Sequence, residues 1–162
     1  MHLTRWAVTQ ILTSRIEALN AISYGGSLMS KITGSCLCGK VTFETNNNFD
    51  KFHFCYCRQC QKTTGSAHAS NLFTHPDNIT WLSGFELVKR FDVAGRSISK
   101  AFCTECGCGV PYLSGSGKAL VVPAGCLDAN PDIAPQDKIF CSEKPEWYDK
   151  AIYAKSFLEF AE

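Results

Sequence analysis

The sequence lacks the features that identify membrane proteins and nucleic-acid-binding proteins. No run of about 18 uncharged apolar residues is present, which argues against a membrane-spanning helix. The formal net charge is only +1 and, apart from Lys89-Arg90, the basic residues occur singly, so no basic patch for nucleic acid or acidic lipid is visible. We therefore expect neither a nucleic acid nor a membrane as a partner.

Several common catalytic motifs are missing as well. The sequence has no Gly-x-Ser-x-Gly motif, no phosphate-binding loop, no dinucleotide-binding glycine pattern and no cluster of paired carboxylates. It also has no internal repeat and no low-complexity tract. These absences leave the ten cysteines as the main source of chemistry in the chain.

The composition is that of one globular domain. Apolar residues make up 45% and charged residues 19% of the 162 positions, enough apolar residues for a single hydrophobic core. We expect the main domain over residues 31–150, after an N-terminal extension over 1–30. A C-terminal tail is expected over 151–162. Residues 149–160 are predicted to form a short helix.

The first 30 residues differ from the rest, because their apolar residues recur as on one face of a helix. These apolar residues are Trp6, Ile11, Leu12, Ile16 and Leu19. Arg15 and Glu17 interrupt the stretch, which argues against a secretory signal. Two alternatives to a native helix stay open: a mitochondrial presequence, and an upstream extension with Met29 as the physiological start.

From Gly34 onward, short β-branched or apolar runs alternate with turn residues, which is typical of a mainly β protein. The turns are rich in Gly, Asn, Asp and Pro, as in Ser83-Gly84. The predicted strands cover residues 40–45, 52–56, 69–74, 79–82, 87–91, 98–102, 110–113, 120–124 and 138–140.

Seven of the ten cysteines fall into three tight groups, which favours metal binding over disulfides. They are Cys36 and Cys38, then Cys55, Cys57 and Cys60, then Cys103 and Cys106. Residues i and i+2 of a strand point to one face with Cα atoms about 6.6 Å apart, and a Cys-x-x-Cys turn aims both sulfurs inward. Disulfides within such pairs would be strained. Because metal-binding thiols must stay unoxidised, we expect a reducing, cytoplasmic location.

The first and last groups together supply four thiolates. Cys36, Cys38, Cys103 and Cys106 form the ligand set of a closed structural zinc site. Gly107 permits the positive φ that turns backbone amides toward the sulfurs, and Gly39 is placed to do the same. Such a site would join two distant segments of a sheet whose strands are too short to be stable alone.

The middle group, formed by Cys55, Cys57 and Cys60, supplies only three thiolates and so leaves one zinc coordination position open. A second interpretation is a structural zinc whose fourth ligand is another His or Cys. The candidates for that ligand are His53, His68, Cys108, Cys126 and Cys141. The last three also fit small core residues in apolar strand contexts. Four polar residues beside the group are candidates for holding an anionic substrate: Arg58, Gln61, Lys62 and Thr64.

Three ordered cysteine motifs resemble one known family. They are Gly34-Ser35-Cys36-Leu37-Cys38-Gly39, Cys55-Tyr56-Cys57-Arg58-Gln59-Cys60-Gln61-Lys62 and Phe102-Cys103-Thr104-Glu105-Cys106-Gly107. Over residues 33–147 the chain resembles the glutathione-dependent formaldehyde-activating enzymes, a family that also includes centromere protein V. The resemblance implies an Mss4-like fold of several small, coiled antiparallel sheets. It also implies two zinc ions per chain, one structural on four cysteines and one catalytic on three.

The resemblance further implies the activity. We expect a zinc-dependent carbon–sulfur lyase of the S-(hydroxymethyl)glutathione synthase type, which adds glutathione or a similar thiol to formaldehyde or a related small electrophile. The alternative is a non-catalytic zinc module that binds a thiol metabolite or a protein partner. Neither the true thiol and carbonyl nor the oligomeric state follows from the sequence.

Overall fold

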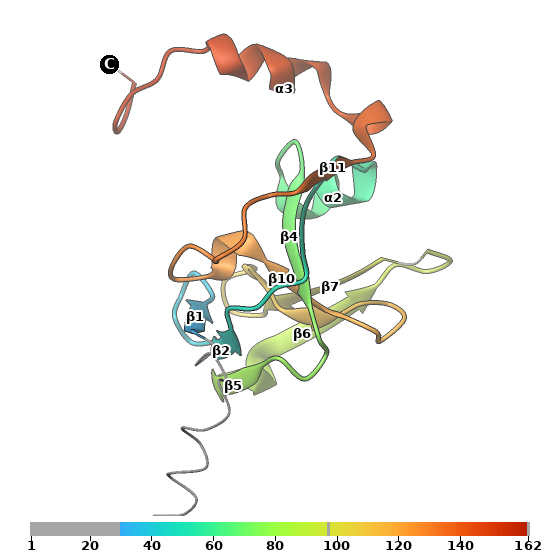
Figure 1. Cartoon of the computed structure of the whole chain (residues 1–162), viewed down its shortest axis with the longest axis vertical. Helices are drawn as coiled ribbons and strands as arrows, with labels where there is room; N and C mark the ends of the chain where they lie inside the picture. Colours follow the sequence, from blue (N-terminus) through green and yellow to red (C-terminus); the bar gives the residue numbers. More distant parts are fainter. Residues whose placement is uncertain (1–29, 97, 162) are drawn as a thin grey trace, which may run out of the picture.

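The computed structural model describes residues 30–96 and 98–161, so the helix predicted within the first 30 residues falls almost wholly outside them. Within this range no helix is both long and apolar enough to cross a membrane. Most of the regular structure is β, in short strands joined by turns (Figure 1). The mainly β prediction is therefore confirmed.

The described chain contains strands, two α-helices and several one-turn 3₁₀ segments. The strands are β1 (Lys31–Ser35), β2 (Thr42–Asn46), β3 (Lys51–Cys55), β4 (Ala69–Thr74), β5 (Thr80–Ser83), β6 (Val88–Asp92), β7 (Ser99–Cys103), β8 (Gly109–Val110), β9 (Tyr112–Leu113), β10 (Leu120–Pro123) and β11 (Asp137–Ile139). The helices are α2 (Arg58–Thr64) and α3 (Glu146–Lys150), and the 3₁₀ segments are η1 (Phe85–Leu87), η2 (Ala124–Cys126), η3 (Cys141–Glu143) and η4 (Ala151–Tyr153).

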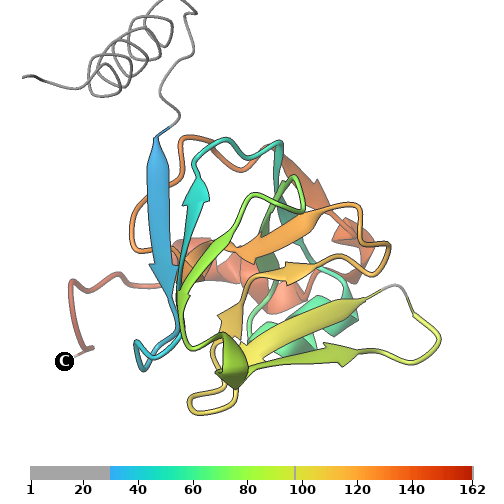
Figure 2. The same cartoon turned by 90° about the horizontal axis from the view of Figure 1, so that it is seen from below.

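The strands form three small sheets, as Figures 1 and 2 show. Their strand orders are β1-β2-β5, β11-β3-β4-β10-β9 and β6-β7-β8. All named pairings are antiparallel except β11 with β3, which is parallel and sets Ile139 beside Cys55. This edge strand brings a late segment of the chain against the strand that leads into the middle cysteine group.

Three clusters of buried residues make up the core, and Phe43 belongs to one of them. In β2 every second residue is buried, so Phe43 has no exposed surface and packs edge-on to Trp81, with ring centroids 5.9 Å apart. Leu72 of β4 and Val122 of β10 belong to the same cluster and are fully buried. Burying each such side chain stabilises the fold by about 1.5–3 kcal/mol.

The strand predictions are confirmed to within two residues, with three differences. The strand predicted over 110–113 is divided at Pro111, which has no N–H for a ladder, so that β8 and β9 belong to different sheets. Strand β1 was not predicted, because a glycine interrupts its alternation of apolar residues. Helix α2 was not predicted either, because at seven residues it is too short to show a helical period.

The prediction of a helix over 149–160 is wrong. The helical segment begins earlier, with α3 directly after Pro145, and ends with η4 at Tyr153. Ile152 is 77% exposed and Phe160 is 91% exposed, so the expected apolar stripe has no core to pack against. In Figure 1 this C-terminal segment runs away from the sheets. Without tertiary packing a helix this short is not stable.

Candidate functional site

The first cysteine group joins two turns that are far apart in the sequence. Cys36 and Cys38 follow β1, whereas Cys103 ends β7 and Cys106 lies in the next turn. Their four Sγ atoms all lie within 4.8 Å of one another. Those of Cys36 and Cys38 are 3.4 Å apart, and those of Cys38 and Cys103 are 4.0 Å apart. The fold thus brings together the four side chains that their spacing had paired.

The two turns of this group have the same backbone form. Gly39 and Gly107 both have φ = 72°, where a residue with a side chain would be strained by about 1–2 kcal/mol. The N–H of Gly39 donates to the carbonyl of Cys36 over 2.9 Å, and the N–H of Gly107 donates to that of Cys103 over 2.8 Å. The positive φ expected at both glycines is confirmed, but their own N–H groups donate to backbone carbonyls and not to the sulfurs.

Hydrogen bonds lower the pKa of the Cys36 and Cys106 thiols, whereas at Cys38 the backbone N–H of Lys40 is outweighed by the neighbouring thiols, which raise its pKa to about 11. Burial opposes ionisation of Cys36, but the N–H of Val41, 3.3 Å from its Sγ, and the neighbouring thiols together lower its pKa to about 6. A tetrahedral zinc with Zn–S bonds of about 2.3 Å needs sulfurs about 3.8 Å apart. The two measured separations lie on either side of that distance. The group therefore fits a closed four-thiolate metal site.

The second group lies at the junction of β3 and α2. Cys55 ends β3, Cys57 is the N-cap of α2, and Cys60 lies in its first turn. The Sγ of Cys57 accepts a 3.4 Å hydrogen bond from the N–H of Cys60. All three Sγ atoms lie within 4.8 Å of one another, and each residue is at most 7% exposed. The arrangement can hold one metal ion through three protein sulfurs.

No fourth side-chain ligand joins this second group within the described chain. The Nδ1 of His53 instead lies 3.2 Å from a carboxylate oxygen of Asp137. His68 stacks on Phe54, with ring centroids 4.4 Å apart. The interpretation in which another His or Cys completes a structural site is therefore not supported by this geometry. Three sulfurs leave one position of a tetrahedral ion open.

The electrostatics of the two groups differ. Burial raises the pKa of the Cys55 and Cys60 thiols, and the nearby Lys100 opposes this effect only in part at Cys60. Three buried thiolates without a cation would repel one another in a medium of low polarity. The donor set is therefore suited to a divalent ion, whose charge offsets that of the thiolates.

Helix α2, which carries Cys60, is held in place by the turn at 141–143. The N–H of Arg58 donates to the Glu143 carboxylate over 2.8 Å. The side-chain amide of Gln61 donates to the carbonyl of Tyr56 over 2.5 Å and to that of Glu143 over 2.9 Å. These bonds fix the start of the helix, and therefore the direction in which its cysteines point.

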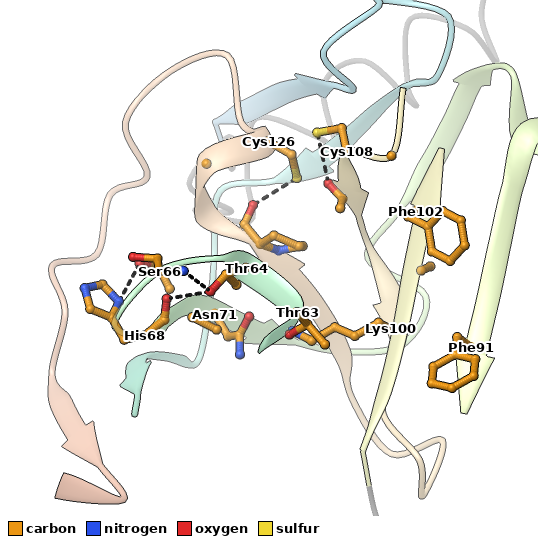
Figure 3. A pocket seen from close by; sticks show the side chains of 17 residues that line it. Thr63, Thr64, Ser66, His68, Asn71, Phe91, Lys100, Phe102, Cys108 and Cys126 are labelled. Atoms are coloured by element: carbon orange, nitrogen blue, oxygen red, sulfur yellow. Dashed lines mark hydrogen bonds between the residues drawn. The ribbon is translucent and has the colours of Figure 1, made fainter. Parts of the chain in front are cut away.

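A cavity of about 630 Å³ is lined by residues of α2, β4, β7 and η2 and by the turn after Cys106, and none of the seven grouped cysteines lines it (Figure 3). One wall is Thr63 and Thr64 of α2, whose hydroxyls both donate to the carbonyl of Cys60. Ala69, which packs in the same buried cluster as Cys55, Cys57 and Cys60, also lines the cavity. The opposite wall includes Lys100 of β7 and Gly107 of the first group's turn.

Of the four residues predicted to hold a substrate, only Thr64 lines this cavity. Arg58 and Lys62 are exposed, and Arg58 also donates to the Gln61 amide oxygen over 3.3 Å. Both donor contacts of Gln61 are to backbone carbonyls, so its amide is engaged in holding α2. A role of these four residues in substrate binding remains a prediction.

The three remaining cysteines have different surroundings. Cys126 is buried, as predicted, and Cys108 is half-buried; both line the cavity. The prediction of a small core residue at Cys141 is wrong, because it lies exposed in η3 with its thiol 3.3 Å from the carbonyl of Lys138. Cys141 follows the edge strand β11, which pairs with a strand on one side only.

Lys100 and Asn71 are among the polar residues of the cavity that were not predicted from the sequence. Lys100 lies between Ser99 and Ala101 in β7, where buried and half-buried residues alternate. That alternation signals that Lys100 and Phe102 share the less buried face of the strand. The sequence gives no sign that β7 and α2 face each other across a cavity.

Two cysteine groups on a scaffold of small sheets define a candidate metal-binding protein with an adjoining cavity. The family model for the glutathione-dependent formaldehyde-activating enzyme matches residues 31–143, and the chain belongs to this family. The match spans both cysteine groups and ends at Glu143. The resemblance inferred from the three cysteine motifs is therefore confirmed.

One solved structure supports the fold. The chain is similar to a crystal structure of a Rhodobacter sphaeroides protein, with 22% identity and a TM-score of 0.52. The similarity covers 65% of this chain and 98% of that one. Among curated proteins, none matches the chain.

Proposed function

We propose that this protein is a zinc-dependent carbon–sulfur lyase of the S-(hydroxymethyl)glutathione synthase type. It joins glutathione, or a similar thiol, to formaldehyde or a related small electrophile. Three converging sulfurs with no fourth side-chain ligand among the described residues carry the proposal, and a cavity lined by their neighbours Thr63, Thr64 and Ala69 accompanies them. Membership in the glutathione-dependent formaldehyde-activating family supports it.

In the reaction the thiol sulfur forms a bond to the carbonyl carbon, and the carbonyl π bond breaks. The thiol proton ends on the oxygen, so the product is a hydroxymethyl thioether and no other group leaves. The reverse direction returns thiol and aldehyde. This addition needs neither an oxidant nor a further substrate.

Cys55, Cys57 and Cys60 would hold the second zinc, and Cys36, Cys38, Cys103 and Cys106 the first. When bound, the second ion supplies a Lewis acid that keeps an incoming thiol in its nucleophilic thiolate form. The short α2 positions the cysteines, because its first turn is held by Glu143 and its last turn is hydrogen-bonded to Cys60. The cavity wall, including Thr64, holds both reactants close together.

The deciding experiment measures thiol-dependent consumption of formaldehyde, with the uncatalysed rate subtracted. Cys57→Ser should abolish the enzymatic rate because it removes one of three ligands. Cys141→Ser is the matched control, since Cys141 is exposed and belongs to neither group, and it should retain the rate. A wild-type protein no faster than background excludes the lyase reaction.

Metal content separates this function from the alternative of a non-catalytic zinc module. Two zinc ions per chain, one removed readily by a chelator, favour an open site. Two inert ions favour a structural protein that binds a thiol metabolite or a partner. In either case the thiolates need a reducing compartment such as the cytoplasm.

The proposal places this chemistry in one domain over residues 31–150. Residues 1–30 are then an extension outside the site, and 151–162 a tail. Limited proteolysis that leaves a core with both metals and unchanged activity supports this division. Loss of either metal on removal of the tail contradicts it.

A further inference from the structure

Lys100 stands out among the residues of the cavity because of its charge. Within the described chain it is the only Lys, Arg, Asp or Glu that lines the cavity wall. The other lining side chains are small, apolar or neutral polar, apart from the partly buried His68. The electrostatic field in the cavity is therefore dominated by this single cation.

The ammonium of Lys100 is half-buried and has no carboxylate partner among the described residues. Its Nζ lies 5.4 Å from the ring centroid of Tyr112, and this cation–π contact stabilises the charge from one side only. Figure 3 shows the side chain extending from β7 toward Thr63 of α2. It therefore reaches from one wall of the cavity toward the helix that carries Cys60.

Asn71 supplies a second free polar group in the same wall. The residue is only 6% exposed, and within the part of the chain that the structure describes its side-chain amide has no protein hydrogen-bond partner, while its polar atoms stay accessible from the cavity. An amide that faces the cavity in this way can hydrogen-bond to a bound ligand. Lys100 and Asn71 together form a site for an acceptor group such as a carboxylate.

We propose that Lys100 is the specificity-determining residue of the cavity and binds a carboxylate of the substrate thiol. This inference rests on the proposed function and adds to it a substrate class, thiols that carry a carboxylate. A charged hydrogen bond to a carboxylate is about twice as strong as a neutral one. Glutathione belongs to this class, and neutral or cationic thiols do not.

Steady-state kinetics with two small thiols test the selectivity. For 3-mercaptopropionate, Lys100→Met should raise KM about tenfold or more with kcat largely kept. For the neutral 2-mercaptoethanol, KM should stay within twofold. Lys100→Arg keeps the charge and should recover most of the loss. Lys89→Met is the matched control, since Lys89 is exposed on β6 and does not line the cavity.

A binding measurement keeps the test independent of catalysis. The probe 3-(methylthio)propionate carries the carboxylate but no free thiol, so its binding needs no reaction. Calorimetry should detect binding to wild type and to Lys89→Met, and a loss of about tenfold or more in Lys100→Met. Equal binding by wild type and Lys100→Met, or no binding to wild type, overturns the role of Lys100.

The two measurements also separate this inference from the proposed function. If wild type consumes no formaldehyde but binds the thioether through Lys100, the lyase proposal fails and the anion site stands. If Lys100→Met raises KM equally for both thiols, Lys100 maintains the shape of the cavity and does not bind the thiol through its charge. That result overturns the inference while the lyase activity stands.

Discussion

The backbone N–H of Arg58 donates a 2.8 Å hydrogen bond to the carboxylate of Glu143, 85 positions later in the chain. The start of helix α2 is therefore held by a distant side chain, in addition to its own N-cap Cys57. The helix carries Cys60, and its N-cap is Cys57, so two of the three cysteines of the second group lie at this helix start. Their geometry depends on a residue that is itself outside the group.

The first prediction concerns this contact. Glu143→Ala should reduce the free energy of unfolding by about 1 kcal/mol, as loss of a helix-capping group does. It should also speed the loss of the second metal to a chelator, because the helix start is less firmly held. Glu146→Ala, on the exposed α3, is the control and should change neither quantity. Equal metal loss in both variants would show that Glu143 has no role in positioning.

The second prediction concerns the four-cysteine group. Cys106→Ala leaves three thiols where four close the site, so the two turns lose the ion that joins them. We expect the variant to aggregate or to melt without cooperativity, as measured by circular dichroism. Cys108→Ala changes a thiol only two residues away that belongs to neither group, and it should melt cooperatively. A soluble, cooperative Cys106→Ala contradicts a structural role for this site.

The third prediction compares two glycines with the same backbone angle. Gly84 has φ = 68° and Gly95 has φ = 69°, but only at Gly84 would a Cβ meet another group, the carbonyl oxygen of Lys40 at 2.3 Å. Both alanine variants should lose about 1–2 kcal/mol from the positive φ. Gly84→Ala should lose about 1–3 kcal/mol more, because the clash is with backbone. Urea denaturation measures both, and equal losses would refute the steric explanation.

The fourth prediction concerns pH. Burial lowers the pKa of His68 below its ordinary value near 6.5. As pH falls, the imidazole of the unfolded chain is therefore protonated at a higher pH than that of the folded chain. His68 lowers the free energy of unfolding below about pH 6.5 and has no such effect well above it. Unfolding free energy should decline between about pH 7 and pH 6 in wild type.

The corresponding variants isolate this contribution. His68→Phe keeps an aromatic ring on Phe54, removes the titrating group, and should flatten the decline. His75→Phe is the control, because the His75 side chain is 74% exposed, and it should leave the decline unchanged. The opposite ranking of the two variants would show that His68 is not the responsible residue.

Much of the scaffold follows from local patterns. Alternation of buried and exposed residues is directly visible in strands such as β2 and β7, and the spacing of Cys36, Cys38, Cys103 and Cys106 pairs two distant turns correctly. Both are properties of a few consecutive residues. The spacing of metal ligands adds information on which distant segments come together, and most sequences lack such information.

The features that were missed depend on contacts between distant segments. Helix α2 forms because Cys57 and Glu143 cap it, and no periodic run announces it. The C-terminal segment has apolar residues with helical spacing, yet no surface to bury them. The cavity needs α2, β4 and β7 together, so the place of Lys100 in its wall cannot be predicted from its neighbours in sequence.

The parallel pairing of β11 with β3 also orders events during synthesis. Ribosomes extend a chain at about 5–20 residues per second, so Cys106 leaves the exit tunnel seconds before Glu143. The four-cysteine turns can capture their ion on the nascent chain, whereas the trio still lacks β11 and the cap of α2. We therefore expect the four-cysteine group to be complete on the nascent chain before the full surroundings of the trio have formed.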